Sequence, residues 1–143
     1  MSLTEAQKAE VKATMQQYAT AYEKKDIKGL VAVFSPGICG FGSGPDEVIR
    51  DQRDFIRQIT RDMSQATVNA VEFSETNISG EGRIAWVMTR TSITFTVTGA
   101  GKQTLRGRST MVLRNTGSRW LIAQFHFSLP YGGQSAGQSF PGA

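Results

Sequence analysis

The sequence predicts an α+β protein in which helices precede an antiparallel sheet. Apolar residues recur with a helical period of 3.6 as far as Ala66 and with the strand period of two beyond it. Helices and strands that are segregated in this way are typical of the α+β class. The length of 143 residues, of which 39% are hydrophobic and 20% charged, fits one domain. We therefore predict a single domain over residues 1–130 and a flexible tail, rich in glycine and serine, over residues 131–143.

Three helices are predicted in the first half of the chain. The first follows a capping box, formed by Ser2 with Glu5 or by Thr4 with Gln7. Asp26 can serve as the N-cap of the second helix, and the third helix starts at Asp51. Each helix has apolar residues at helical spacing, which we expect to face the core: Val11, Met15, Tyr18 and Tyr22; Ile27, Leu30, Val31 and Phe34; Phe55, Ile56, Ile59 and Met63.

Five strands are predicted, and four of them follow one another in the second half. A short strand over residues 38–42 lies before the third helix. The later strands cover residues 67–78, 83–98, 103–114 and 119–129, and glycine-containing turns join them. The apolar residues change phase between Trp86 and Ile93, and this change predicts a bulge near residues 89–92.

The last strand has apolar residues on both of its faces. One face carries Trp120, Ile122, Gln124, His126 and Ser128, and the other carries Leu121, Ala123, Phe125, Phe127 and Leu129. A solvent-exposed face does not normally carry five apolar residues in succession. Because the helices can cover only one face, we predict that a second copy of the chain covers the other, in a homodimer through Leu121, Phe125 and Phe127.

Charge and composition exclude several classes of partner. The twelve acidic residues all lie in residues 1–81, whereas residues 82–143 contain seven basic residues that are scattered along the predicted strands. Without a basic cluster or an aromatic RNA-binding motif, we predict no nucleic-acid partner. No apolar run is long enough for a membrane span and the N-terminus resembles no secretory signal, so we predict a cytoplasmic protein without a membrane partner. With one cysteine, Cys39, and one histidine, His126, we expect no disulfide, no metal and no cofactor.

Short motifs at both ends of the chain occur in an order that resembles a known family. Near the end of the chain, a strand with the pattern Arg108-x-Thr110-x-Val112 is followed by the pattern Trp120-x-Ile122-x-Gln124-x-His126-x-Ser128. Near the beginning, two tyrosines, Tyr18 and Tyr22, precede Asp26, Leu30, Phe34-Ser35-Pro36 and the loop at residues 42–47. The pattern over residues 5–130 resembles SnoaL-like proteins of the nuclear-transport-factor-2-like superfamily, in the branch near the association domain of calcium/calmodulin-dependent kinase II. The resemblance implies helices packed in the concave face of a strongly curved antiparallel sheet, a pocket inside this cone, and homodimers that pack sheet against sheet.

The chain departs from this superfamily at the catalytic carboxylates. Ketosteroid isomerases of the superfamily use an aspartate on an early strand, and the cyclases use an acid on a later strand. Here residues 38–41 offer only Cys39, and no acid follows Glu81. The acids on the helices lie beside lysines and arginines, where solvated pairing is their ordinary role. We therefore predict that any acid–base chemistry uses His126 as the base, with Tyr18 or Tyr22 as its partner; the alternative is a histidine that is hydrogen-bonded within the core.

The predicted pocket depends on the pairing of the last two strands. A turn that sets Arg114 opposite Arg119 places Gly107 across from His126, where a small residue leaves space. The same register puts Arg106 and Arg108 on the dimer side, although either could hold a carboxylate in a pocket. The residues that we expect to bind the ligand are Tyr18, Tyr22, Phe34, Phe41, Trp86, Trp120, Gln124 and His126.

The predicted function is the binding of a small anionic or apolar molecule by a homodimer. An isomerase, hydratase or cyclase that uses His126 with a tyrosine is the first alternative, and the missing strand carboxylates disfavour it. An oligomerisation module similar to the kinase association domain is the second alternative.

Overall fold

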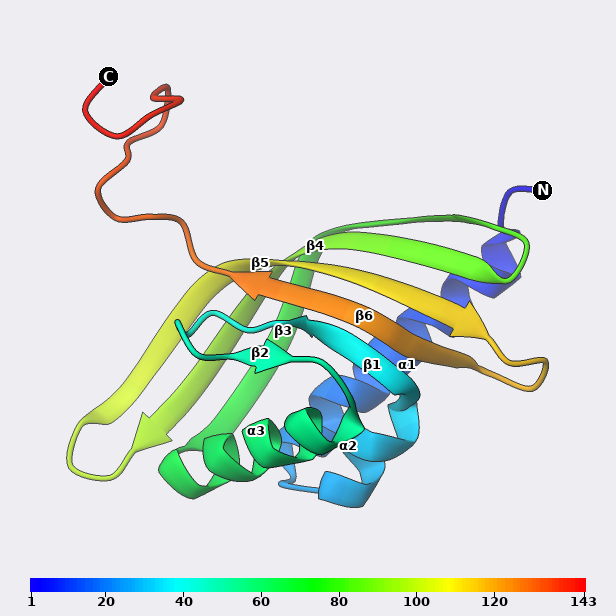
Figure 1. The fold of residues 1–143 in the computed structure, drawn as a ribbon, viewed down its shortest axis with the longest axis horizontal. Coiled ribbons are helices and arrows are strands. Elements are labelled where there is room, and N and C mark those ends of the chain that lie inside the picture. Colours follow the sequence, from blue (N-terminus) through cyan, green and yellow to red (C-terminus); the bar gives the residue numbers. More distant parts are fainter.

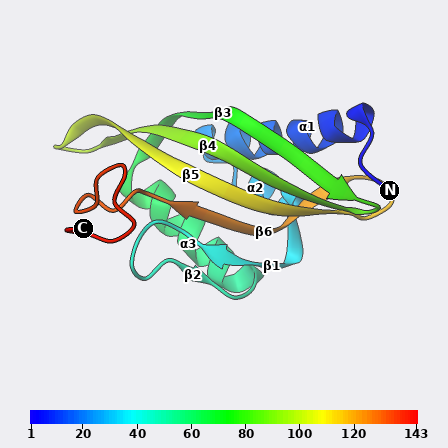
Figure 2. The same cartoon turned by 90° about the horizontal axis from the view of Figure 1, so that it is seen from above.

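In the computed structural model, which describes residues 1–143, three helices lie against one side of a curved, open six-stranded sheet (Figure 1). Four of the five neighbouring strand pairs are antiparallel, and β1 and β6 pair in parallel. The strand order is β2-β1-β6-β5-β4-β3, which Figure 2 shows from above. The elements are α1 (Glu5–Glu23), α2 (Ile27–Val33), β1 (Phe34–Phe41), β2 (Val48–Ile49), α3 (Gln52–Gln65), β3 (Thr67–Glu81), β4 (Ile84–Val97), β5 (Gly101–Asn115) and β6 (Trp120–Ser128). The predicted α+β class is confirmed.

Side-chain caps begin all three helices, and the first two are caps that the sequence predicts. Thr4 and Gln7 form the capping box of α1, in which each side chain accepts a hydrogen bond from the other residue's backbone N–H. Asp26 accepts from the backbone N–H of Gly29, and Asp51 accepts from that of Asp54. These bonds satisfy amide donors that have no partner within the helix.

The sheet and the helices enclose the core between them. Helix α1 packs along β3, and α3 packs beneath β1 and β2 (Figures 1 and 2). Leu30, Ile38, Leu113 and Ile122 are fully buried between these layers. The sheet therefore has an inner face toward the helices and an outer face away from them.

Strand β4 keeps one phase along its whole length, so the predicted bulge at residues 89–92 is wrong. Its pairing with β5 runs without interruption from Ile84 to Val97. The irregularities lie in the neighbouring strand β3, between Val68 and Ala70 and between Ser74 and Asn77, where Glu75 has a positive φ of 50°. Because β4 alternates without interruption, Trp86 lies on the outer face and is 49% exposed, while its neighbour Val87 is buried.

Strand β6 contains a bulge that the sequence did not reveal. Ile122 pairs with Leu113 of β5, but Gln124 pairs with Val112, so that Ala123 is an extra residue in β6. Trp120 and Ile122 face inward before the bulge, and Phe125 and Phe127 face inward after it. The predicted two-face alternation of this strand is therefore wrong beyond Ala123, because one inserted residue exchanges the faces.

Beyond Ser128 the chain forms turns but no helix or strand, and it leads away from the sheet (Figure 1). Tyr131 and Phe140 are largely exposed there. None of the three helices is both long and apolar enough to cross a bilayer.

Candidate functional site

A cavity of about 300 Å³ lies between the inner face of the sheet and helices α1 and α3. Its walls are mainly apolar, and aromatic rings form much of them. Four of the rings form a cluster: the centroid of Phe34 lies 4.2 Å from that of Phe55, 5.7 Å from that of Tyr18 and 5.9 Å from that of Phe125. A cavity of this size and lining suits a small, mostly apolar molecule. The aromatic residues at its wall are Tyr18, Tyr22, Phe34, Phe55, Phe95, Phe125 and Phe127.

One carboxyl group in the cavity wall, that of Asp62 on α3, is held by two side chains. The Tyr22 hydroxyl donates a short hydrogen bond to Asp62 Oδ2. The Gln58 amide donates to Asp62 Oδ1 over 2.7 Å and also to Glu47 Oε1 over 2.9 Å. Tyr22 of α1 and Gln58 of α3 therefore fix the orientation of this carboxyl group, and Glu47 of the β1–β2 loop in turn holds Gln58.

Burial changes the acidity of Asp62. Removal of the carboxylate from water raises the pKa of Asp62, and the negative charge of Glu47 also raises it, although the bonds from Tyr22 and Gln58 oppose the rise. The pKa values of Tyr18 and Tyr22 lie above their ordinary value as well, because both phenols are buried beside Asp62. Both tyrosines are therefore protonated donors at neutral pH, and the pKa of Asp62 moves toward the range in which a general acid or base is most effective.

The hydroxyls of Tyr18, Thr91 and Ser109 are the other polar groups deep in the wall. Tyr18 packs edge-on against Tyr22 and Phe34, and its hydroxyl has no hydrogen-bond partner within the protein. Thr91 Oγ1 and Ser109 Oγ lie 2.8 Å apart on the sheet side of the cavity. No lysine, arginine or histidine contributes to the wall. The lining therefore disfavours the anionic ligand that the sequence left open.

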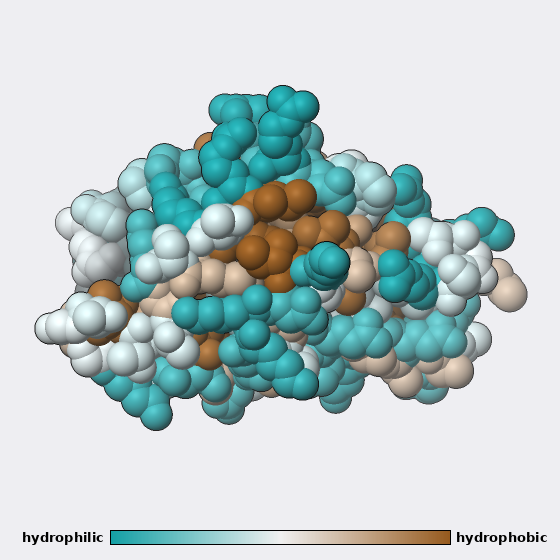
Figure 3. Space-filling view, turned by 90° about the horizontal axis from the view of Figure 1, so that it is seen from below, coloured by the Kyte–Doolittle hydropathy of each residue, from teal (hydrophilic) through white to brown (hydrophobic).

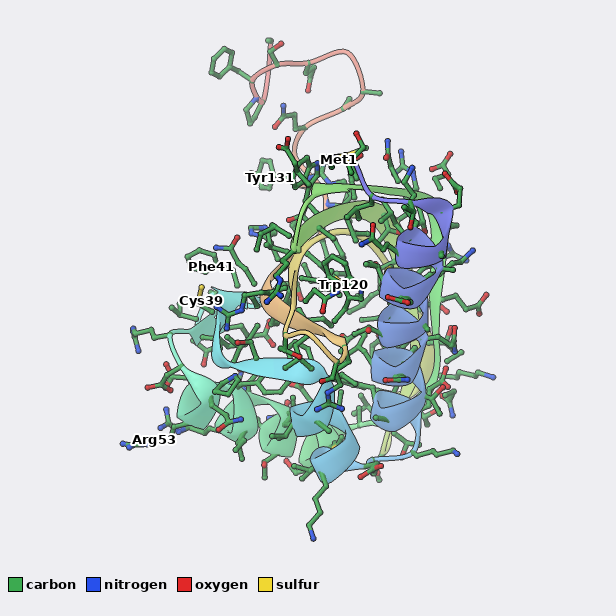
Figure 4. The ribbon with its side chains drawn as sticks, turned by 90° about the vertical axis from the view of Figure 1, so that its right-hand side faces the viewer. Met1, Cys39, Phe41, Arg53, Trp120 and Tyr131 are labelled. Atoms are coloured by element: carbon green, nitrogen blue, oxygen red, sulfur yellow. The ribbon has the colours of Figure 1, made fainter.

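Three of the eight predicted ligand-binding residues line the cavity, namely Tyr18, Tyr22 and Phe34. Trp120 is buried in the core beside α1, where its indole N–H donates to Glu10 Oε2 over 3.1 Å (Figure 4). Phe41 is exposed on β1, and Trp86 is exposed on the outer face of β4.

The predicted position of His126 in the cavity is wrong. His126 lies opposite Thr110 of β5, not opposite Gly107, and it is exposed on the outer face. Its ring contacts Phe41 edge-on, with 5.9 Å between the centroids. Gln124 shares this face, where its amide lies 3.8 Å from Cys39 Sγ. The bulge at Ala123 turned both side chains outward, and no tyrosine of the cavity reaches His126.

The same bulge changes the face on which two of the residues expected at a dimer interface lie. Phe125 and Phe127 line the cavity, so only Leu121 of the predicted interface lies on the outer face. Arg106 and Arg108 are exposed on that face as well, and Arg108 lies opposite Ser128. Arg90 pairs with Glu75.

Asp62 and the pair of Thr91 and Ser109 were missed by the sequence analysis. Asp62 lies three residues after Ile59 and seven after Phe55, so it shares the buried stripe of α3. A carboxylate on an apolar helical stripe was the available signal. Thr91 and Ser109 carried no signal of their own, because hydroxyl residues are common on both faces of a strand.

The comparisons with known proteins agree with this architecture. The model of the SnoaL-like domain matches residues 11–132. No curated protein is significantly similar in sequence. One similar solved structure is a ketosteroid isomerase-like protein from Erwinia carotovora atroseptica, with a TM-score of 0.75 and 19% identity over 90% of this chain and 99% of that chain. A second is an NTF2-like protein of unknown function from Pseudomonas putida KT2440, with a TM-score of 0.76 and 17% identity over 90% of each chain. A third is a candidate dehydratase of the NTF2-like family from Streptomyces avermitilis, with a TM-score of 0.79 and 16% identity over 90% of this chain and 99% of that chain. The structural likenesses show the fold, and the sequence match shows that the chain belongs to the SnoaL-like family.

Proposed function

We propose that the protein binds a small, uncharged and largely apolar molecule in the cavity and transfers a proton to or from it through Asp62. The observation that carries this proposal is a carboxyl group of raised pKa, oriented by Tyr22 and Gln58, in the wall of an aromatic cavity that contains no basic side chain. An uncharged molecule loses little hydration when it enters such a space, whereas an anion would meet Asp62 and Glu47 without a counter-charge.

The proposed reaction is an isomerisation or dehydration of a carbonyl compound. Asp62 in its ionised form accepts a proton from the carbon next to the carbonyl, and the bonding electrons move to the carbonyl oxygen. The Tyr18 hydroxyl, which has no partner within the protein, donates a hydrogen bond to that oxygen as negative charge develops. Asp62 then returns the proton to another carbon, which completes an isomerisation, or to a departing hydroxyl group, which completes a dehydration.

The names of two similar structures support this reaction class by analogy. One is called ketosteroid isomerase-like and the other a candidate dehydratase. Their identities of 19% and 16% transfer the fold alone, so the argument rests on Asp62, Tyr18 and Tyr22.

The binding proposal is tested by calorimetric titration of the protein with 2-naphthol, an uncharged two-ring phenol. We expect saturable binding at one site, and we expect 2-naphthoate, its anionic counterpart, to bind at least tenfold more weakly. Equal affinity for the two probes, or no binding of 2-naphthol, would contradict the proposal.

The reaction proposal is tested with cyclohex-3-enone, whose isomerisation to the conjugated ketone is followed by absorbance. We expect Asp62→Asn to lower the rate roughly a hundredfold or more, the usual value of a general base, and Tyr18→Phe to lower it by a smaller factor. His126→Asn on the outer face is the matched control and should leave the rate unchanged. A wild-type protein without activity on this ketone would contradict the isomerase function and leave ligand binding.

We also propose that the outer sheet face forms a homodimer, although through residues other than those expected from the sequence. Ile84, Trp86 and Met88 are all exposed along β4, and Leu121 is half-buried two strands away. Exposed large apolar side chains that succeed one another on one face of a strand mark an interaction surface more often than scattered ones do. Sedimentation should show a dimer at micromolar concentration and a monomer after Trp86→Glu. A wild-type monomer would contradict this proposal without affecting the cavity.

A further inference from the structure

Two hydroxyl groups on the sheet side of the cavity have one hydrogen bond between them. Thr91 on β4 and Ser109 on β5 are 3% and 6% exposed, and their oxygens lie 2.8 Å apart. Both residues belong to the cavity wall. They face the cavity from the sheet, whereas Asp62 and Tyr22 face it from helices α3 and α1. These helices lie against one side of the sheet (Figure 1).

The count of hydrogen atoms in this pair leaves one donor unused. Two hydroxyl groups have two O–H hydrogens, and only one of these is engaged in the mutual bond. Neither oxygen has a further hydrogen-bond partner within the protein. An unused donor in apolar surroundings costs free energy, and an acceptor atom of a ligand would recover it.

A neighbouring threonine on the same strand shows the contrast. Thr89 is equally buried, but its hydroxyl contacts the backbone carbonyl of Ser74 at 3.1 Å and the hydroxyl of Thr76 at 2.8 Å. Both O–H hydrogens of the Thr76–Thr89 pair therefore have acceptors within the protein. Of these two hydroxyl pairs, only Thr91 and Ser109, which face the cavity, keep an unused donor.

An aromatic ring of the protein lies beside this pair. Gly107 lies opposite Thr91, and the ring of Phe127 occupies the place of the missing side chain: a Cβ atom on Gly107 would lie 2.6 Å from this ring. Phe127 itself lies opposite Ser109 in β6. An aromatic wall thus adjoins the two hydroxyls.

We propose that Thr91 and Ser109 form a second polar subsite, which donates a hydrogen bond to a neutral oxygen acceptor of the ligand. This inference rests on the proposed function and narrows its ligand class to ring compounds with two oxygen groups. One oxygen meets Tyr18 and Asp62 on the helical side, and the other, a carbonyl, ether or hydroxyl oxygen, meets the hydroxyl pair on the sheet side. A carboxylate is not expected there, because the wall offers no positive charge.

Two probes of nearly equal shape test the subsite: 6-methoxy-2-naphthol, which has an ether oxygen at the far end, and 6-ethyl-2-naphthol, which has a methylene group there. We expect the wild-type protein to bind the methoxy compound about fivefold more tightly, the value of one net hydrogen bond. The double variant Thr91→Val with Ser109→Ala should bind the two probes equally.

The outward-facing pair Thr94 and Thr104 supplies the matched control, since it joins the same two strands and its hydroxyls lie 3.2 Å apart. Replacement of both by valine should preserve the fivefold preference. No preference in the wild-type protein, or an undiminished preference in the Thr91/Ser109 variant, would overturn the subsite while 2-naphthol binding still supports the cavity.

A crystal structure of the wild-type protein with 6-methoxy-2-naphthol makes the test independent of the variants. We expect the ether oxygen within about 3.2 Å of Thr91 Oγ1 or Ser109 Oγ. A methoxy group turned away from both oxygens, or a water molecule held by the pair in the complex, would overturn the proposal. If neither naphthol binds, the proposed function fails and the subsite fails with it.

Discussion

The inner and outer faces of one sheet differ in the chemistry that their side chains offer. The inner face has aromatic rings, two hydroxyls and no basic group around the cavity. The outer face has His126, Arg106 and Arg108 together with the exposed ring of Trp86. Figure 3 shows the molecule from below: on that side, hydrophobic residues gather near the middle and hydrophilic residues surround them.

This difference shows that residue type alone does not locate a functional site on a sheet. The single histidine is the side chain most often chosen for proton transfer near neutral pH, yet it lies on the outer face. Asp62, an acid of ordinary type on a helix, lies in the cavity wall because the buried stripe of α3 includes it. Position relative to the fold decides which group can meet a ligand.

The largest effect is expected from deletion of Ala123. Without this extra residue, either the residues before it or those after it must exchange faces, so that Trp120 and Ile122 or Phe125 and Phe127 would turn outward. Loss of two buried large side chains costs about 4 kcal/mol or more, a large part of the stability of a domain of this size. Circular dichroism during urea titration should show loss of the cooperative transition. A variant with near-wild-type stability would contradict the assignment of the bulge.

A pair of adjacent substitutions in β6 tests the two faces directly. Phe125→Glu puts a charge into the aromatic cluster with Phe34 and Phe55, and we expect a loss of about 3–5 kcal/mol in the free energy of unfolding. His126→Glu, one residue further, should change it by less than about 1 kcal/mol, because that side chain is exposed. Urea denaturation of both variants measures the difference. Equal losses would show that the two faces are not distinguished as described.

These two experiments concern the part of the fold that could not be predicted from the sequence. The helices and their caps follow from local patterns, since Thr4, Asp26 and Asp51 act on the residues directly after them. The short strand β2 and the parallel pairing of β1 with β6 were not predicted, because pairing between distant segments leaves no local pattern. The bulge at Ala123 depends on how β6 pairs with β5, and alternation within β6 alone cannot reveal it. In β4 the inner residues Ala85 and Val87 are smaller than the outer residues Trp86 and Met88. The size of the apolar side chains therefore predicted the wrong face of this strand as the inner one.

The candidate site was predictable only where it belongs to the helices. Tyr18 and Tyr22 were found because they share a helical face and have polar groups that need partners when buried. Asp62 shares a face with Phe55 and Ile59 by the same criterion, but its arginine neighbours in the sequence suggested an exposed ion pair. Arg61 pairs with Asp46 at 2.7 Å and not with Asp62, which leaves Asp62 to Tyr22 and Gln58.

A smaller effect is expected in how the free energy of unfolding depends on pH. This dependence distinguishes the buried Asp62 from acids that are exposed to solvent. Burial raises the pKa of Asp62 above that of the unfolded chain, near 4, so between these two values the folded state binds more protons. The contribution of Asp62 to the free energy of unfolding therefore falls as the pH rises through this window. Asp62→Asn removes the dependence.

Urea titrations of the wild-type protein and Asp62→Asn from pH 3.5 to pH 8 measure this contribution as a difference. We expect the wild type to lose stability relative to the variant as the pH rises from about 4, and the difference to become constant above the raised pKa. A difference that is constant over the whole range would show that Asp62 titrates as an exposed acid does.

The smallest effect is expected from His126→Gln. The imidazole is exposed on the outer face, and its one described contact is the edge of the Phe41 ring, which is itself 53% exposed. Loss of a contact between two exposed rings changes the free energy of unfolding by about 0.5 kcal/mol or less. The affinity for 2-naphthol should stay within twofold of the wild-type value, because no atom of His126 belongs to the cavity wall. Calorimetric titration of the two proteins side by side measures this. A tenfold loss of affinity in this variant, at unchanged stability, would mean that the ligand binds on the outer face beside His126 and not among the aromatic rings of the cavity.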